Sequence, residues 1–176
     1  MRASLLFVLL ACSLLALSAD AASGALKVGD RAPAFALQGS DGKLHRLSDY
    51  AGRAVVIAWF PRAFTSGCTI ECKSLAANSK KLRAYAVSYF MASVDPLADN
   101  KRFAESENAD FPLLSDPSKR IATAYGVLSA AGFANRHTIY IGADGRITAI
   151  DTQVKPATSA EDMLRRLDEL RVPKQR

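Results

Sequence analysis

The sequence predicts an α/β domain in which a central mixed sheet is flanked by helices. Residues 54–60 and 89–94 are continuous apolar, β-branched runs, typical of strands covered on both faces. A helical pattern separates the two runs and another follows them, and this order favours a parallel pair joined by a right-handed crossover. Near the end of the chain, residues 137–142 and 146–151 flank an Ala-Asp-Gly turn signal at 143–145, which predicts an antiparallel hairpin.

The first residues predict an export signal rather than a part of this domain. Arg2 precedes an apolar run over residues 5–17, and Ala-Asp-Ala at 19–21 is a small-x-small cleavage pattern. The run is shorter than the roughly 20 apolar residues that a membrane span needs. We therefore expect residues 1–21 to be a signal peptide and residues 22–176 to form one domain of a secreted or periplasmic protein, with no stable membrane insertion after cleavage.

The first half of the domain supplies a small hairpin, the first buried strand and a helix. Residues 35–37 and 43–47 flank Ser-Asp-Gly-Lys at 40–43, which predicts a hairpin that extends the sheet. After the strand, apolar residues recur at helical spacing from Thr69 onward, and the charged residues fall elsewhere. The apolar stripe consists of Cys72, Leu75, Leu82 and Ala86.

The second half supplies further helices around the late hairpin. Asp95 and Pro96 suit the N-cap and first position of a helix that runs to about Asn108. Thr158 and Glu161 form a capping box for the closing helix. The residues of that helix expected to face inward are Met163, Leu164, Leu167 and Leu170. This order of elements is the thioredoxin-like topology with an N-terminal hairpin extension.

The composition is that of an ordinary globular domain, so we expect disorder only at the tail, residues 172–176. The net charge is +6, but no Lys or Arg cluster is longer than two residues. An evenly spread excess of this kind does not predict a nucleic-acid groove. We expect His45 to be exposed on the hairpin and Trp59 to belong to the core.

Cysteine usage indicates chemistry rather than stapling. If the signal is cleaved, Cys12 is lost with it, and the mature chain holds Cys68 and Cys72. A bridge between them would close too small a loop to stabilise the fold much, whereas small secreted domains carry several bridges. An uncleaved N-terminal anchor and a lipoprotein acylated at Cys12 are the alternatives to a cleaved signal.

Cys68 lies where a thiolate is stabilised. It follows a strand end and a loop, and Thr65 or Ser66 can cap the helix that starts there. Cys68 then falls in the first turn, where backbone N–H groups are free and the helix dipole is positive. A thiolate attacks the O–O bond of a peroxide, and the sulfenic acid that results can condense with a second thiol. The sequence therefore predicts a peroxide-reducing cysteine.

Three features carry a resemblance to a known family. The pattern Pro61-x-x-x-Thr65-x-x-Cys68 matches the peroxiredoxin active site at every fixed position. The stretch FPLLSDPSKRIATAYGV, residues 111–127, is similar to the segment that follows in that family. Arg136 stands just before a predicted strand, as the family's active-site arginine does. The chain thus resembles the alkyl hydroperoxide reductase and thiol-specific antioxidant family, and most of all its bacterioferritin-comigratory branch.

The resemblance covers residues 28–151 and implies a role for each matching residue. Cys68 would be the peroxidatic thiolate, Thr65 would hydrogen-bond the sulfur and the peroxide, and Pro61 would shield the thiolate from water. Arg136 would hold Cys68 as thiolate and polarise the peroxide oxygens. Each also has a simpler explanation: Thr65 as a helix cap, Pro61 as a strand terminator, and Arg136 as a solvated strand-end residue.

The implied activity is that of a thiol peroxidase in antioxidant defence. Its substrates would be hydrogen peroxide or small organic hydroperoxides, and a thioredoxin-like or small-molecule thiol would regenerate it. The resemblance implies no metal, no organic cofactor and no nucleic-acid partner, in a monomer or a homodimer.

Cys72 departs from the family pattern. The branch places a resolving cysteine five residues after the peroxidatic one, in sequences such as GCTKEAC, whereas GCTIEC here is one residue shorter. Side chains four apart on a helix have Cβ atoms about 5–6 Å apart, while a disulfide needs about 3.5–4.5 Å. A Cys68–Cys72 bridge therefore requires the helix start to unwind. Cys72 is a candidate resolving cysteine, a buried small residue beside an externally resolved Cys68, or a metal ligand.

Two other protein classes use similar residues. Thioredoxin-like copper chaperones combine C-x-x-x-C with a late histidine, which makes Cys68, Cys72 and His137 a candidate copper site. However, His137 directly follows Arg136, so in a strand the two side chains point to opposite faces. A thiol-disulfide oxidoreductase would use C-x-x-C, which is absent. A purely structural pair of thiols is the last alternative.

Overall fold

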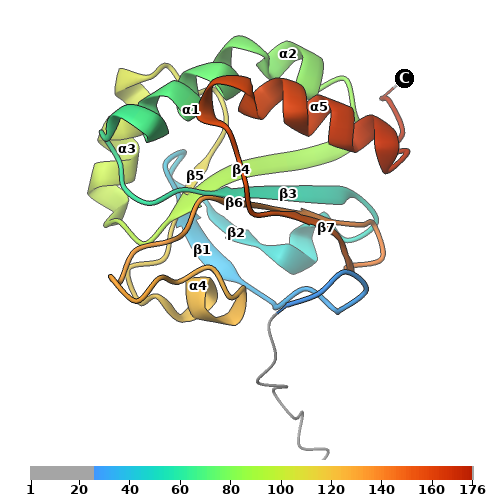
Figure 1. The fold of residues 1–176 in the computed structure, drawn as a ribbon, viewed down its shortest axis with the longest axis horizontal. Coiled ribbons are helices and arrows are strands. Elements are labelled where there is room, and N and C mark those ends of the chain that lie inside the picture. The colour runs from blue at the N-terminus through green and yellow to red at the C-terminus, as the bar shows by residue number, and fades with distance from the viewer. Residues whose placement is uncertain (1–25, 176) are drawn as a thin grey trace, which may run out of the picture.

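A computed structural model describes residues 26–175 and shows a mixed sheet with helices on both faces (Figure 1). The sheet has seven strands in the order β2-β1-β5-β4-β3-β6-β7. The predicted signal peptide lies outside the described residues. Within them, no helix combines the length and apolarity needed to cross a membrane. The strands are β1 (Ala36–Gly39), β2 (Leu44–Arg46), β3 (Ala54–Trp59), β4 (Val87–Ser93), β5 (Leu113–Ser115), β6 (His137–Ile141) and β7 (Ile147–Asp151).

The centre of the sheet forms as the sequence predicts. The buried strands β3 and β4 run parallel, and the helical segment between them provides the crossover. On its other side β3 pairs antiparallel with β6, which forms the late hairpin with β7. Strand β5 lies within the segment 111–117, where the sequence predicts no strand, and it joins the N-terminal hairpin to β4. The predicted fold class is confirmed.

Helices cover the two faces unequally. In Figure 1, α1, α2 and α5 lie on one side of the sheet and α4 lies on the other. Alternate residues of β3 point to opposite faces of the sheet. Val56 and Ala58 belong to the core beneath α1 and α5. Val55, Ile57 and Trp59 belong to the core on the other face. Trp59 is fully buried, as predicted. The helices are α1 (Ser66–Ala77), α2 (Ser79–Leu82), α3 (Leu97–Ser106), α4 (Arg120–Ala124) and α5 (Ser159–Glu169), with short 3₁₀ turns η1 (Leu47–Tyr50) and η2 (Pro156–Thr158).

The first predicted helix begins where the sequence places it but ends earlier than expected. It starts at Ser66, directly after Thr65 in the N-cap position, and it ends at Ala77, so Leu82 and Ala86 of the predicted stripe do not belong to it. Asn78 interrupts the helix, because its side-chain amide donates to the carbonyl oxygen of Ser74 at 3.0 Å and so caps the last turn. Leu82 is buried in α2, and Ala86 precedes β4.

Asp95 does not cap the following helix, and this part of the prediction is wrong. Helix α3 begins at Leu97 with Pro96 in the N-cap position and no side-chain cap. The Asp95 carboxylate accepts instead from the backbone N–H of Ala63 and from the hydroxyl of Ser93, both at 2.9 Å. These two donors, brought close by the fold, occupy the carboxylate, and they tie the loop after β3 to the end of β4.

Two further expectations are wrong: the exposure of His45 and the disorder of the tail. His45 is only 7% exposed, because its ring contacts the Tyr50 hydroxyl at 2.5 Å and the Asp41 carboxylate at 3.0 Å. The tail is ordered as far as Gln175, whose N–H donates to the Ala84 carbonyl at 2.7 Å. The His45 ring also packs edge-on against Phe90 of β4 at 5.2 Å, and the tail pairs with the segment before β4, so in both cases a partner remote in the sequence contributes to the difference.

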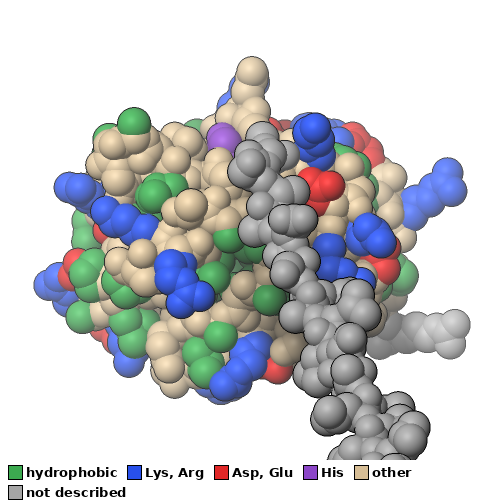
Figure 2. All heavy atoms as spheres, turned by 90° about the horizontal axis from the view of Figure 1, so that it is seen from below, with side chains coloured by type: hydrophobic (Ala, Val, Ile, Leu, Met, Phe, Trp, Pro, Cys, Tyr) green, Lys and Arg blue, Asp and Glu red, His purple; other side chains and the backbone are tan. Residues whose placement is uncertain are grey.

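The basic residues of the surface are dispersed. On the face shown in Figure 2, Lys and Arg side chains are separated by hydrophobic and uncharged atoms, and acidic side chains lie among them. No continuous basic track crosses this face, in line with the spread of charge along the sequence.

Candidate active site

The loop after β3 positions the start of α1. Phe60 extends the pairing of β3 with β4, because its N–H donates to the Ala92 carbonyl at 2.9 Å. Pro61 follows and ends the strand. Phe64 has a left-handed backbone, with φ of 65°. A bulky residue rarely adopts this conformation, and here the sharp reversal turns the chain into α1. The Phe64 ring packs edge-on against Phe103 at 5.2 Å and remains 52% exposed.

Cys68 lies in the first turn of α1 and is fully buried. The backbone hydrogen bonds of the helix begin beside Cys68, where the Thr69 N–H donates to the Thr65 carbonyl at 2.9 Å. The Nη2 of Arg136 donates to the Cys68 sulfur at 3.2 Å. The fold thus joins a helix start and a guanidinium that lie 68 residues apart in the sequence.

The same guanidinium forms a buried ion pair with Glu71. Its Nη1 donates to Glu71 Oε2, and the hydroxyl of Ser159 donates to Oε1 at 3.3 Å. Glu71 is fully buried. Burial raises the pKa of the Glu71 carboxyl, and the Arg136 charge and the Ser159 hydroxyl oppose that rise. Burial also acts to lower the pKa of Arg136, but Glu71 and Cys68 outweigh it and raise the pKa, so the guanidinium stays charged.

Glu71 is a site residue that the sequence interpretation missed. It lies three positions after Cys68, so both side chains fall on the same face of α1. A carboxylate within an otherwise apolar helix face was the available signal, because such a group is rarely buried without a cationic partner.

Gly67 is a second residue that was missed. A Cβ atom at this position would lie 3.1 Å from Arg136 Nη2 and 3.9 Å from the Pro156 side chain. The absence of a side chain therefore lets the guanidinium pass close over the first turn of α1 to reach the sulfur.

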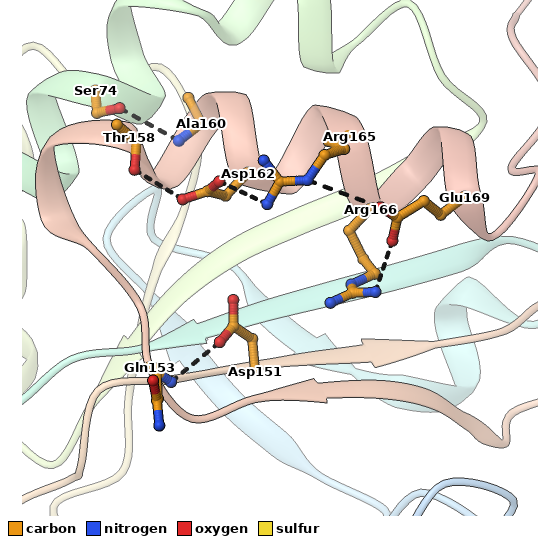
Figure 3. Close-up of polar contacts among 9 residues, drawn as sticks. All are labelled: Ser74, Asp151, Gln153, Thr158, Ala160, Asp162, Arg165, Arg166 and Glu169. Carbon is orange, nitrogen blue, oxygen red and sulfur yellow. Dashed lines mark hydrogen bonds and ion pairs between the residues drawn. The ribbon is translucent and has the colours of Figure 1, made fainter.

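A hydrogen bond links the start of α5 to α1 (Figure 3). The Ala160 N–H donates to the Ser74 hydroxyl at 3.2 Å and links α5 to α1. The predicted capping box does not form. Thr158 occupies the N-cap position, but its hydroxyl donates to the Asp162 carboxylate at 2.7 Å, a charged acceptor that competes well for the hydroxyl.

Thr65 and Pro61 border the site without touching the sulfur through a hydrogen bond. Thr65 occupies the N-cap position of α1, but its hydroxyl donates to the Arg62 carbonyl at 3.0 Å and caps no N–H of the helix. The expected side-chain cap is therefore absent. Pro61 is half-buried where β3 gives way to the loop.

Cys72 lies one turn further along α1 and is also fully buried and unbridged. Burial raises the pKa of its thiol to about 12, and the negative charges of Glu107 and Glu71 add to the rise. Glu107 Oε2 accepts no hydrogen bond, and the Lys73 ammonium lies 3.6 Å from it. In the closed helix, Cys72 is held as a neutral thiol.

His137 does not join the two cysteines. It belongs to the same alternate set of β6 residues as Ile139 and Ile141, which lie in the core opposite the cysteines. The intervening Tyr140 lies in the core that contains both cysteines. Within residues 26–175, no three His, Cys, Asp or Glu residues cluster closely enough to hold a metal ion. The candidate copper ligands are therefore not brought together.

Comparison with known proteins identifies the family. The model of the AhpC/TSA family matches residues 28–150. The chain belongs to this family of peroxiredoxins. It is 32% identical over 151 residues to peroxiredoxin Bcp of Escherichia coli K12, covering 82% of this chain and 97% of that protein. It is 30% identical to the selenocysteine-containing peroxiredoxin PrxU of Peptoclostridium acidaminophilum, covering 74% and 70%.

Solved structures agree with this assignment. Peroxidoxin BcpB of Mycobacterium tuberculosis superposes with a TM-score of 0.75 at 28% identity, covering 82% of this chain and 98% of that one. A mutant of PrxQ from Xylella fastidiosa gives a TM-score of 0.77 at 23% identity, covering 85% and 99%, and supports the fold. The expected activity is confirmed at this level: the protein is a Bcp-type peroxiredoxin, a thiol-dependent peroxidase.

Proposed function

We propose that Cys68 is the peroxidatic residue of this peroxiredoxin. Its thiolate attacks one oxygen of the peroxide, and the S–O bond forms as the O–O bond breaks. Sulfur supplies the electron pair and becomes a sulfenic acid, while the other oxygen leaves as water or an alcohol after taking up a proton. The observation that carries this proposal is the 3.2 Å contact between Arg136 Nη2 and the Cys68 sulfur at the start of α1.

Arg136 stabilises the charge as it moves from sulfur to the leaving oxygen. One nitrogen of its planar group is held by the buried Glu71, so the orientation of the group is fixed before substrate arrives. Ser159 fixes Glu71 in turn. A pre-oriented donor costs no reorganisation during the reaction.

Thr65 and Pro61 shape the approach to the sulfur. Thr65 is exposed, and we assign its hydroxyl to the incoming peroxide, which it reaches by releasing the Arg62 carbonyl. Pro61 presents no N–H and limits the access of water to the thiolate.

Cys72 resolves the sulfenic acid after α1 opens. Its thiol condenses with the Cys68 sulfenic acid to give a disulfide and one water. An external thiol of thioredoxin-like or small-molecule type then reduces that disulfide. Both cysteines lie on the same buried side of α1, which supports this pairing. Opening of the helix start brings the sulfurs into bonding range and frees Cys72 from the burial that keeps it protonated.

Mass spectrometry of the peroxide-treated protein tests both assignments. We expect the natural chain to lose two hydrogens through a Cys68–Cys72 bridge, and Cys72→Ala to accumulate a trappable sulfenic acid at Cys68. Cys68→Ser should not react with peroxide. A Cys68→Ser variant that still consumes peroxide would overturn the first assignment. A natural chain that forms sulfenic acid but no internal bridge would assign resolution to an external thiol.

The exported location is a separate proposal. It rests on the charged start, the apolar run and the small-x-small site within residues 1–21. N-terminal sequencing of the protein recovered from a periplasmic fraction should give a chain that begins at or near residue 22. An intact Met1 would indicate an uncleaved anchor, and a lipid on Cys12 would indicate a lipoprotein.

A further inference from the structure

A cavity of about 270 Å³ lies at the end of the sheet opposite the active site. Strand β3 begins at this cavity with Ala54 and runs to the loop that precedes Cys68 and α1, so the length of one strand separates the cavity from the active site. The end of α5 and the chain terminus lie at the same end of the sheet, on the right in Figure 1. The peroxidase chemistry described above uses none of the residues that line it.

The interior of this cavity is mainly apolar. Small and aliphatic residues come from the start of β3, the end of β6, the end of α5 and the tail. An apolar cavity of about 150 Å³ suffices for benzene. This cavity is nearly twice as large, so it can accept an alkyl group with up to about twice as many carbons as benzene. Its apolar residues include Val56, Ile141, Leu167, Leu170 and Val172.

Two arginines also form part of the wall. Arg53 and Arg171 are both exposed. Among residues 26–175, neither lies within 4.0 Å of a carboxylate, which is also true of other exposed arginines such as Arg62 and Arg120. Two cations without an acidic partner beside an apolar space are complementary to an anion with an apolar tail.

The backbone at Arg171 gives an independent indication. This residue follows α5 with a φ of 55°, a left-handed conformation that helix ends usually assign to glycine. The helix-ending hydrogen bonds need only this conformation: Arg171 N–H donates to the Asp168 carbonyl at 2.9 Å, and Val172 N–H to Leu167 at 3.0 Å. Arg171 therefore stands next to the cavity, at a backbone cost, in a position where glycine would fit.

The tail fixes one wall of the cavity in place. The Ala86 N–H donates to the Pro173 carbonyl at 2.6 Å, and the Lys174 ammonium lies over the Tyr85 ring at 5.3 Å. The wall is thus tied to the segment before β4, and the cavity exists before any ligand binds.

We propose that this cavity binds a medium-chain alkyl carboxylate. The alkyl chain occupies the apolar interior, and the carboxylate lies between the guanidinium groups of Arg53 and Arg171, which match its planar geometry. This site is distinct from the peroxidase site, and the binding of the carboxylate to it does not depend on the redox state of Cys68.

Isothermal titration calorimetry of the reduced, folded protein with octanoate tests this proposal. We expect saturable binding at one site, with much weaker binding of 1-octanol, which lacks the charge, and of acetate, which lacks the chain. Arg53→Ala should weaken octanoate binding at least tenfold. Arg120→Ala, which removes an exposed arginine from the remote helix α4, should leave it unchanged.

Arg171→Gly separates ligand binding from stability. Because glycine relieves the left-handed backbone, this variant should melt at a higher temperature than the natural chain and still bind octanoate at least tenfold more weakly. Amide chemical shifts should change at Ala86 and Leu170 when octanoate is added to the natural chain. Absence of saturable binding, equal affinity of Arg171→Gly, or shifts confined to α1 would each overturn the proposal.

Discussion

At the scale of single residues, the guanidinium of Arg136 makes two different contacts with one rigid group. Nη2 reaches the Cys68 sulfur at 3.2 Å, while Nη1 pairs with Glu71. A lysine ammonium has three donors on one freely rotating nitrogen, so it would not fix the two contacts in one plane as the guanidinium does. The buried carboxylate therefore determines where the charge meets the sulfur.

Glu71→Gln should slow the oxidation of Cys68 by hydrogen peroxide about tenfold. Glutamine keeps the size of the side chain but loses the charge that holds Arg136, so the guanidinium gains freedom to turn. Stopped-flow fluorescence, or mass spectrometry of samples quenched at successive times, measures the rate. Glu161→Gln, at an exposed position of α5, is the matched control and should react at the natural rate. An unchanged rate in Glu71→Gln would mean that the ion pair serves stability alone.

Thr65 provides a second test at this scale. Thr65→Ser keeps the hydroxyl and should retain most of the oxidation rate, whereas Thr65→Val should lower it by about 10²-fold. Neither variant should disturb the packing much, since Thr65 is exposed. If Thr65→Val reacts at the natural rate, the hydroxyl serves only the Arg62 carbonyl.

At the scale of elements, α1 carries both cysteines in opposite chemical conditions. Cys68 meets a cation at the helix start, and Cys72 is buried one turn later beside negative charges. The sequence predicted the first condition from the loop and cap residues. It also placed Cys72 on the apolar stripe of the helix, but it could not predict the nearby Glu107, because this residue follows α3 and only tertiary packing brings it near Cys72.

The burial of Cys72 should make stability depend on pH. Its folded-state pKa, about 12, lies above the ordinary value of 9.0. The folded state therefore holds this proton more tightly, and its contribution is complete below about pH 9 and declines as the pH rises toward 12. Urea unfolding of the reduced protein at pH 8 and pH 10 should show a smaller loss of unfolding free energy for Cys72→Ala than for the natural chain. Equal losses would contradict the burial of an intact thiol.

At the scale of the whole molecule, buried polar groups hold the sheet together where strands are short. Asn100 is fully buried on α3, and its amide donates to the Leu114 carbonyl at 3.1 Å and to the Ser115 hydroxyl at 2.8 Å. The Ser93 hydroxyl oxygen lies 3.1 Å from the same amide nitrogen, which shares its two hydrogens among the three oxygens. One side chain thus joins α3 to the carboxyl ends of β4 and β5.

Asn100→Ala should lower the free energy of unfolding by about 2–3 kcal/mol, because it leaves buried partners without their hydrogen bonds. Asn135→Ala, at an exposed position, should change it by less than about 0.5 kcal/mol. Equilibrium urea unfolding measures both. A loss at Asn100 no larger than that of the control would show that water replaces the amide.

The sequence predicts the parts of the fold that local patterns determine. The runs that form β3, β4, β6 and β7 are apolar enough to identify, and the turn before β7 is explicit. Strand β5 has only three residues and was not predicted. The local pattern marks Glu71 as a carboxylate on an apolar helix face, but it does not identify Arg136 as its partner. The burial of His45 depends in part on Phe90 of β4, which is remote in the sequence.

We expect Arg136 to activate Cys68 for attack on peroxide. The most direct measurement is the second-order rate of Cys68 oxidation by hydrogen peroxide in Cys72→Ala protein, with and without Arg136→Ala, after circular dichroism has shown that both are folded. We predict a rate far above that of free cysteine and a loss of at least about 10²-fold without the guanidinium. Equal rates with and without Arg136, or a rate no faster than free cysteine, would contradict the account.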